Sequence, residues 1–401
     1  MRNLGGVAIL MNDVKYIVGT PDICNIPLMA CSPEAIDFAS ELSPLLMRNA
    51  LSRLFPDVAA FAFWCRKGNV EKIKDNCPEY GCRLGRGLCF HVAPSNIPIN
   101  FAFTYMFGLF AGCANIVRIP SKEFPQTERL LEELDRLLDK HEEVKKRTAF
   151  VRYPADSSAT LELSRIADAR MIWGGDKTVL KIKSLETKPK CVDITFADRY
   201  SLCVLDGKAV ESASDDALNR LSDDFYNDTY LMDQNACSSP QMILWLNDSE
   251  YARKRFWDAV FCVAKKKYLL QAAVSVDKYT QLTQDSIDSA ENIKFFEKKE
   301  NLLYRVELMS LNKDVQFKRG HGGYFYEHSL ANWDELFDIV SEKYQTITYF
   351  GIDAEELRSK IVTNRLRGID RIVPIGKAMD IGPMWDGYDI IRMLSRKINL
   401  I

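Results

Sequence analysis

The chain has 401 residues, 47% of them hydrophobic and 27% charged, which is typical of a globular protein with two or three domains. Lys and Arg total 53 against 55 Asp and Glu, and this net charge of −2 argues against nucleic-acid binding. The first residues lack the basic segment, apolar core and cleavage site of a secretory signal. We therefore expect a cytoplasmic protein.

The 11 cysteines are an odd number in a chain without a signal, so reduced thiols are expected instead of a disulfide framework. The densest cluster combines Cys77, Cys82 and Cys89 with His91, but it lacks the CxxC pairs of zinc sites, and no metal is predicted. The apolar stretch 97–119 is interrupted by asparagine, proline and glycine. We expect a buried helix and strand there, not a membrane span.

The first 85 residues predict little beyond a packing helix near 33–54. From Gly87 onward, strands and helices alternate. The predicted strands are 88–93, 115–119, 148–152, 169–173, 192–196 and 202–205. The predicted helices between them are 99–112, 126–144, 158–166 and 176–183. This alternation predicts an α/β fold with a parallel, doubly wound sheet.

Two turns in this region are candidates for binding a dinucleotide, because parallel sheets bind ligands at the carboxyl ends of their strands. One turn has glycines where a strand gives way to a helix, and the other offers two cations and a hydroxyl. The candidates are Trp173, Gly174 and Gly175 in the first turn and Arg118, Ser121 and Lys122 in the second. A Gly-Gly turn is often only a turn, surface cations often only face water, and the GxGxxG fingerprint is absent.

A polar, acidic segment at 207–224 marks the passage into a second domain, and its Ser-Ala-Ser-Asp-Asp sequence suits a helix N-cap. Cys237 follows, between small polar residues and an apolar run at 242–245 that predicts a buried strand. An accessible thiol on a turn held by such a strand is a candidate nucleophile. The alternative is an inert, buried cysteine. Further on, short strands are expected near 301–309 and a helix at 333–343.

Five segments in this order resemble the acyl-CoA reductase family (LuxC) of the aldehyde dehydrogenase superfamily, whose best-known members reduce fatty acyl groups in bacterial luminescence. They are HVAPSNIPINFAFTYMFGLFAGCANIVRIPSK, MIWGGDKTV, FYNDTYLMDQNACSSPQ, QTITYFG and GIDRIVPIGKAMDIGPMWDGYD. The resemblance runs from about residue 87 to the C-terminus. It implies a nucleotide-binding domain at 1–206 with a divergent beginning, a catalytic domain at 207–370, and an oligomerisation arm at 371–401 with a strand near 390–400.

The resemblance also implies roles for individual residues. Cys237 matches the catalytic thiol, and Asn96 matches the asparagine whose amide helps to form the oxyanion hole, although its two neighbouring prolines would also suit a turn-forming asparagine. Gly174 and Gly175 match the segment that passes the cofactor pyrophosphate. The cations around Ser121 fall near the adenosine ribose, which suggests NADPH.

The expected activity is NADPH-dependent reduction of an acyl thioester to an aldehyde through an acyl-cysteine. Oxidising relatives activate water with a glutamate, and Thr195 stands near that place here, although Asp193 could lie closer. His321, in a glycine-rich loop, either borders the site or is structural. The alternatives are an aldehyde dehydrogenase that makes an acid, or an inert scaffold. The expected partners are an acyl-CoA or acyl-protein thioester, an acyl-protein synthetase, and further copies in a dimer or tetramer.

Overall fold

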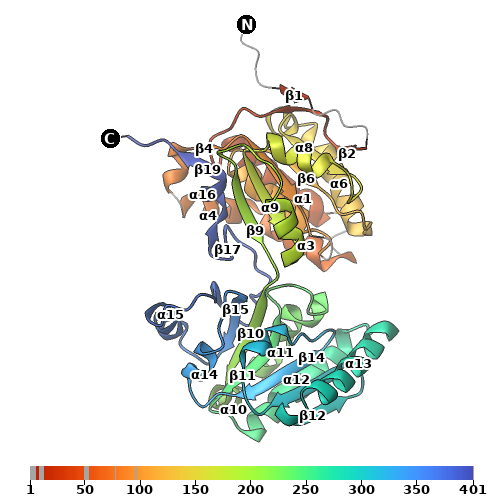
Figure 1. Cartoon of the computed structure of the whole chain (residues 1–401), viewed down its shortest axis with the longest axis vertical. Coiled ribbons are helices and arrows are strands. Elements are labelled where there is room, and N and C mark those ends of the chain that lie inside the picture. The colour runs from red at the N-terminus through yellow and green to blue at the C-terminus, as the bar shows by residue number, and fades with distance from the viewer. Residues whose placement is uncertain (1–5, 9–12, 49–53, 77, 95–96, 401) are drawn as a thin grey trace. The chain divides into compact units, whose positions relative to one another are not determined.

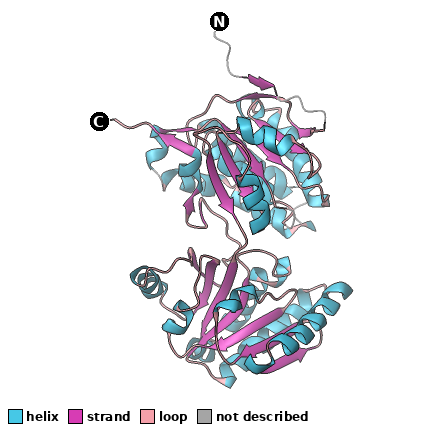
Figure 2. Ribbon diagram, viewed as in Figure 1, coloured by secondary structure: helices cyan, strands magenta, loops and turns pink. Residues whose placement is uncertain are grey.

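The computed structural model describes residues 6–8, 13–48, 54–76, 78–94 and 97–400. The chain divides into two compact units: unit 1 comprises 1–197 and 381–401, and unit 2 comprises 198–380. Each unit is built on one β-sheet with helices against it (Figure 1, Figure 2). No helix in the described ranges is long and apolar enough to cross a membrane.

The sheet of unit 1 has six strands in the order β2-β7-β6-β5-β8-β9. Only β2 pairs antiparallel with its neighbour, and the others are parallel. The bounds are β2 (Lys15–Val18), β5 (Leu88–Val92), β6 (Ala114–Arg118), β7 (Thr148–Arg152), β8 (Ala169–Trp173) and β9 (Val192–Phe196). The predicted parallel sheet is therefore confirmed, and its strand order reverses beside β5, the switch point where such folds bind ligands.

Helices cover both faces of this sheet, because its buried strands are apolar on both sides. On β5, for example, Cys89 belongs to one core and Phe90 to the other. The helices of unit 1 are α1 (Pro33–Arg48), α3 (Pro56–Trp64), α4 (Lys67–Asp75), α5 (Asn100–Phe110), α6 (Pro125–Leu138), α7 (Glu142–Lys145), α8 (Ala159–Ile166) and α9 (Asp176–Lys183). The helix predicted at 126–144 is thus two helices, because the leucine-rich face of α6 ends at Leu138.

The end of the chain also belongs to unit 1. Residues predicted as a strand near 390–400 begin with a helix, α16 (Ile390–Leu394), whose buried apolar residues join the core beside α5. The following β19 (Ser395–Lys397) pairs antiparallel with β4 (Arg83–Gly85). The other short strands are β1 (Gly6–Ala8), β3 (Asp22–Cys24), β17 (Met384–Trp385) and β18 (Tyr388–Asp389).

The sheet of unit 2 has seven strands in the order β12-β13-β14-β11-β10-β15-β16, and only β12 is antiparallel. They are β10 (Tyr200–Asp206), β11 (Pro240–Leu246), β12 (Ile293–Lys299), β13 (Leu303–Leu308), β14 (Tyr324–Ser329), β15 (Tyr344–Phe350) and β16 (Arg371–Pro374). The strand expected at 202–205 is β10, which lies in this sheet and not in the first one. The units divide at 197–198 and 380–381, whereas the boundaries expected from the sequence are 206–207 and 370–371.

All the described α-helices of unit 2 except α13 (Ala272–Asp288) begin at a residue whose side chain caps the helix. The side chain of Ser214 accepts the N–H of Ala217 at the start of α11, as the Ser-Ala-Ser-Asp-Asp pattern predicts. The helices are α10 (Gly207–Ser212), α11 (Asp215–Asp228), α12 (Glu250–Lys267), α13 (Ala272–Asp288), α14 (Trp333–Phe337) and α15 (Ala354–Thr363). The helix predicted at 333–343 ends at Phe337, because the chain soon turns into β15.

Candidate active site

Cys237 lies on the turn that leads into β11, and this turn is held by the side chain of Gln234. The buried Gln234 oxygen accepts the backbone N–H groups of Gly323 at 2.8 Å and Tyr324 at 3.2 Å, and its nitrogen donates to the carbonyl of Tyr324 at 3.0 Å. Asp233 and Gln234 both adopt positive φ, of 50° and 58°. Such backbone costs about 1 kcal/mol or more per residue, which these hydrogen bonds offset.

The half-buried Cys237 contacts two neighbouring strands. Its carbonyl accepts a hydrogen bond from the hydroxyl of Ser201 on β10 at 2.7 Å. Its Sγ accepts one from the side-chain amide of Gln345 on β15 at 3.4 Å. Because β10, β11 and β15 run parallel, these contacts lie at the amino edge of the sheet. No cysteine in the described ranges forms a disulfide.

A glycine-rich loop at 320–323 adjoins the turn. The N–H of Gly320 donates to the side chain of Gln241 at 2.8 Å, and the ammonium of Lys278 donates to the carbonyl of Gly322 at 2.7 Å. Burial lowers the pKa of Lys278 to about 8. His321 is carried by this loop and is partly buried. The backbone N–H groups of Gly320 and Gly323, bonded to Gln241 and Gln234, therefore tie this loop to the turn that carries Cys237.

A second segment, 376–380, is clamped from both sides. The carboxylate of Asp228 accepts the N–H groups of Gly376 at 2.6 Å and Ala378 at 3.0 Å, while the guanidinium of Arg371 donates to the Ala378 carbonyl at 3.0 Å. Burial raises the pKa of Asp228 to about 7. Met379, in this segment, accepts a hydrogen bond from Ser238 at 3.7 Å. The clamp therefore supports the residue next to Cys237.

In unit 1, the predicted cofactor residues gather at the carboxyl edge of the sheet. Arg118 ends β6 and Trp173 ends β8, with β5 between these two strands. A Cβ atom added to Gly175 would meet nothing within 4 Å, so the backbone there is open to a pyrophosphate. The Nε of Arg118 is buried without a partner among the described residues. Both features fit a dinucleotide.

The remaining candidates around this edge differ in their exposure. Ser121 and Lys122 are exposed, and the ammonium of Lys122 lies 4.8 Å from the ring centre of Phe124. Trp173 is buried and stacks on Phe196, with ring centres 3.7 Å apart. The Gly174 backbone donates to the carbonyl of Phe196. Asn96 lies outside the described residues.

The carboxylate of Asp193 is held in an ion pair with Arg170. Both of its carboxylate oxygens accept hydrogen bonds from the buried guanidinium of Arg170, each at 2.7 Å. Thr195 is two residues further along β9 and partly buried. The carboxylate nearest in sequence to the expected glutamate is thus held in a bidentate ion pair, which removes it as a free base.

No group of three or more metal-ligating side chains occurs within the described parts of the chain. His91 illustrates why, since its two ring nitrogens are hydrogen bonded to Thr104 and Asn115, each at 2.9 Å. Burial lowers the pKa of His91 to about 4. This histidine is a satisfied core residue, and Cys77 lies outside the described residues.

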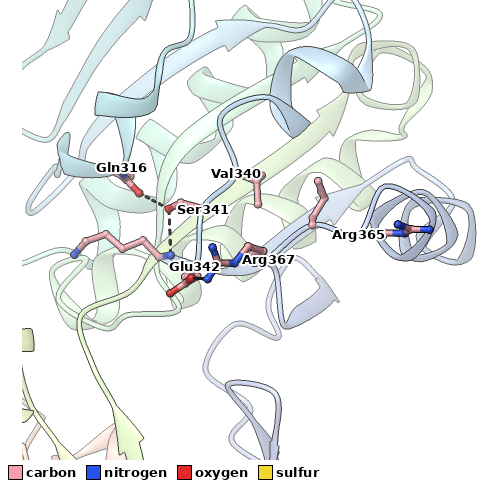
Figure 3. A pocket seen from close by; sticks show the side chains of 8 residues that line it. Gln316, Val340, Ser341, Glu342, Arg365 and Arg367 are labelled. Carbon is pink, nitrogen blue, oxygen red and sulfur yellow. Dashed lines mark hydrogen bonds and ion pairs between the residues drawn. The ribbon is translucent and has the colours of Figure 1, made fainter.

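A hollow of about 540 Å³ on unit 2 is lined by Gln316, Val340, Ser341, Glu342, Lys343, Arg365, Leu366 and Arg367 (Figure 3). Ser341 donates to Gln316, and Arg367 pairs with Glu342. It contains none of the residues predicted for the site. Four of its eight lining side chains are charged, namely Glu342, Lys343, Arg365 and Arg367.

The comparison with protein families decides the broad assignment. The model of acyl-CoA reductase (LuxC) matches residues 66–397. The chain belongs to the LuxC acyl-CoA reductase family. A search of curated proteins finds no significant match.

Solved structures similar to this LuxC family member include two dehydrogenases and a proline utilization A. The NAD-bound 1-pyrroline-5-carboxylate dehydrogenase from Thermus has a TM-score of 0.61 at 12% identity, over 90% of this chain and 79% of that one. The NAD-dependent benzaldehyde dehydrogenase from Corynebacterium glutamicum has a TM-score of 0.59 at 9% identity, over 92% and 85%. Proline utilization A from Bradyrhizobium japonicum has a TM-score of 0.65 at 13% identity, and this chain spans 43% of its length. The fold is therefore aldehyde dehydrogenase-like.

Sequence reasoning missed the polar side chains that support Cys237. Gln345 and Asp228 lie within quoted family segments, but neither receives a role from the sequence. The available signal in the sequence is a polar residue at the start of an apolar strand, or at the end of an amphipathic helix, and the structure buries both residues. Such residues are hydrogen bonded when buried, and their partners become visible only in the fold.

Proposed function

We propose that this protein reduces an acyl thioester to an aldehyde with NADPH, through a covalent acyl group on Cys237. The observation that carries the proposal is the setting of this thiol. It lies on a braced turn at the amino edge of a parallel sheet, and it accepts a hydrogen bond from a buried amide. Membership of the LuxC family supports the same chemistry.

The reaction consists of two substitutions at the acyl carbon: Cys237 replaces the CoA thiolate, and hydride then replaces Cys237. The Cys237 thiolate attacks the thioester carbonyl, and the tetrahedral oxyanion collapses with loss of the CoA thiolate. A bound nicotinamide dinucleotide supplies the hydride that the acyl carbon then accepts. Collapse of the second oxyanion breaks the bond to Sγ, which releases the aldehyde and restores the thiolate. Asn96 is our candidate for an oxyanion donor.

The engagement of Asp193 with Arg170 favours reduction over oxidation, because Asp193 is the carboxylate nearest in sequence to the expected glutamate. An acyl-enzyme that persists until hydride arrives must be protected from hydrolysis, and a free carboxylate beside it would promote that hydrolysis. Asp193 is occupied by Arg170, and its neighbour Thr195 is no base. The reaction product distinguishes the two activities, because reduction yields an aldehyde and oxidation yields an acid.

The choice of NADPH is supported by the cations at the end of β6. The guanidinium of Arg118 lies 4.9 Å from the ring centre of Tyr153, and its buried Nε has no partner among the described residues. Lys122 and Ser121 follow within a few residues and are exposed. We assign these three to the 2′-phosphate side of the cofactor, and Trp173, Gly174 and Gly175 to the pyrophosphate side.

Assembly with other chains is part of the proposal. We infer a homo-oligomer, a dimer or a tetramer, in which the C-terminal residues contribute an arm, and an acyl-protein synthetase as a donor of the acyl group. The alternative of an inert scaffold predicts binding of such a partner without turnover. Size measurement of the purified protein, alone and with the synthetase, tests both inferences.

The decisive assay supplies acyl-CoA of several chain lengths with NADPH or NADH. The expected result is consumption of NADPH with stoichiometric aldehyde, and its loss in Cys237→Ala. Cys262→Ala is the matched control, because Cys262 is an exposed thiol of the same unit. Activity that survives in Cys237→Ala, or acid formed from aldehyde and water, would contradict the proposal.

A further inference from the structure

The side chain of Gln345 is fully buried, yet one of its amide N–H groups is directed at sulfur. Its Nε2 lies 3.4 Å from the Sγ of Cys237, and its relative exposure is 0%. The residue stands at the amino end of β15, one strand away from the hydroxyl of Ser201 that holds the Cys237 carbonyl. Two neighbouring strands thus fix both the backbone and the thiol of the candidate nucleophile.

The hydrogen bonds behind Gln345 set the direction in which its amide donates. A guanidinium has only donors, so Arg371 donates to the hydroxyl of Thr346, at 3.5 Å. The Thr346 hydroxyl in turn donates to the Oε1 of Gln345 at 3.3 Å. Because Oε1 accepts this bond, the amide nitrogen is the atom turned towards Cys237. Hydrogen bonds are thus donated in sequence from Arg371 to Thr346, from Thr346 to Gln345, and from Gln345 to the Sγ of Cys237.

We propose that Gln345 is a catalytic residue whose carboxamide stabilises the Cys237 thiolate by donating a hydrogen bond to Sγ. A neutral thiol is a weak acceptor, whereas an anion accepts strongly, so the bond favours the charged form. The same bond assists the last step, in which the thiolate leaves the acyl carbon. This inference rests on the proposed role of Cys237 as the nucleophile.

A packing role alone would not account for this arrangement. An apolar side chain of similar size would fill the space at the start of β15 without an amide that must be satisfied. The amide here is ordered by Thr346, the next residue of β15, and through it by Arg371 of the neighbouring β16. A purely structural Gln345 would influence stability and leave the chemistry of the thiol unchanged.

Other charged groups lie on the turn that carries Cys237 or in the segments that surround it. They are Asp228, Asp233, Lys278, Arg319 and Arg371. None of these side chains is replaced in the variants below, and Arg371, which loses one acceptor in Thr346→Val, keeps its bonds to the carbonyls of residues 377, 378 and 380.

The test is the rate at which iodoacetamide alkylates Cys237 between pH 5 and 10, followed by mass spectrometry of the peptide that carries it. In Gln345→Leu, we expect the rate at pH 7 to fall about tenfold and the midpoint of the profile to rise by about one pH unit. Thr346→Val, which removes only the group that orients the amide, should show a smaller shift in the same direction. Gln284→Leu, an exposed glutamine on α13, is the matched control.

Cys262 provides an internal reference in every sample, because its exposed side chain reports any general change in alkylation. Identical Cys237 profiles in the wild type, Gln345→Leu and Thr346→Val would overturn the inference. The same experiment with acyl-CoA separates it from the proposed function. If the wild type is not acylated but Gln345→Leu still shifts the alkylation profile, the hydrogen bond stands and the reductase proposal fails.

Discussion

The carboxylate of Asp228 accepts a hydrogen bond from the backbone N–H of Gly376 at 2.6 Å, across 148 positions of sequence. It thereby holds the segment whose Met379 contacts Ser238, the neighbour of Cys237. Burial raises the pKa of Asp228 from 3.8 to about 7, even though two N–H groups favour its ionised form. The buried carboxylate of Asp228, although costly to bury, therefore holds in position the 376–380 segment that contacts the neighbour of Cys237.

This raised pKa predicts a pH dependence with a definite sign. The folded protein binds the Asp228 proton more tightly than the unfolded chain, so the free energy of unfolding falls as pH rises from about 4 to about 7. The slope is at most about 1.4 kcal/mol per pH unit. Asp228→Asn should flatten this contribution, and it should cost about 2 kcal/mol because an amide cannot accept both N–H groups.

Urea unfolding at several pH values measures both effects. Asp216→Asn, an exposed carboxylate of the same helix, is the control and should retain the slope of the wild type. If Asp228→Asn has the slope of the wild type, then Asp228 does not titrate in this range.

Glu327 gives a prediction that concerns stability alone. Its fully buried carboxylate accepts the indole N–H groups of Trp245 and Trp257, each at 2.8 Å, and the Nε of Arg305 at 2.6 Å. Glu327→Gln should lower the free energy of unfolding by about 3–5 kcal/mol, because a buried guanidinium or two indoles lose their acceptor. Glu297→Gln, which removes a more exposed partner of Arg305, should cost about 1 kcal/mol or less. Equal losses in the two variants would argue against this account of the cluster.

Arg118 should determine the preference between the two nicotinamide cofactors. If its guanidinium recognises a 2′-phosphate, Arg118→Ala should raise the KM for NADPH about tenfold, leave that for NADH nearly constant, and change kcat little. Arg129→Ala, an exposed arginine on α6, provides the control. Equal increases for both cofactors would instead mean that Arg118 supports the sheet edge in general. Steady-state kinetics with both cofactors distinguish these outcomes.

Much of unit 1 could be predicted from the sequence, because its buried strands are short apolar runs separated by helices of clear period. The strands from Leu88–Val92 to Val192–Phe196 follow this rule. Tyr200–Asp206 has the same local character, yet it joins the other sheet. Pairing partners far along the chain decide that choice, and local pattern cannot reveal them.

The same limit applies to the candidate site. Cys237 is recognisable from its small, polar neighbours, whereas Gln345 reaches it only because β15 lies next to β10 in the folded sheet. The family resemblance implies a strand near 390–400, but Ile390–Leu394 is a helix, because its packing against α5 outweighs the strand propensity of its isoleucines.

The most direct test of the account is incubation of the protein with an acyl-CoA in the absence of any nicotinamide, followed by mass spectrometry of its peptides. The account predicts one acyl group on Cys237, none in Cys237→Ala, and release of the group as aldehyde when NADPH is added. The absence of an adduct at every chain length, or an adduct on a different cysteine, would contradict it.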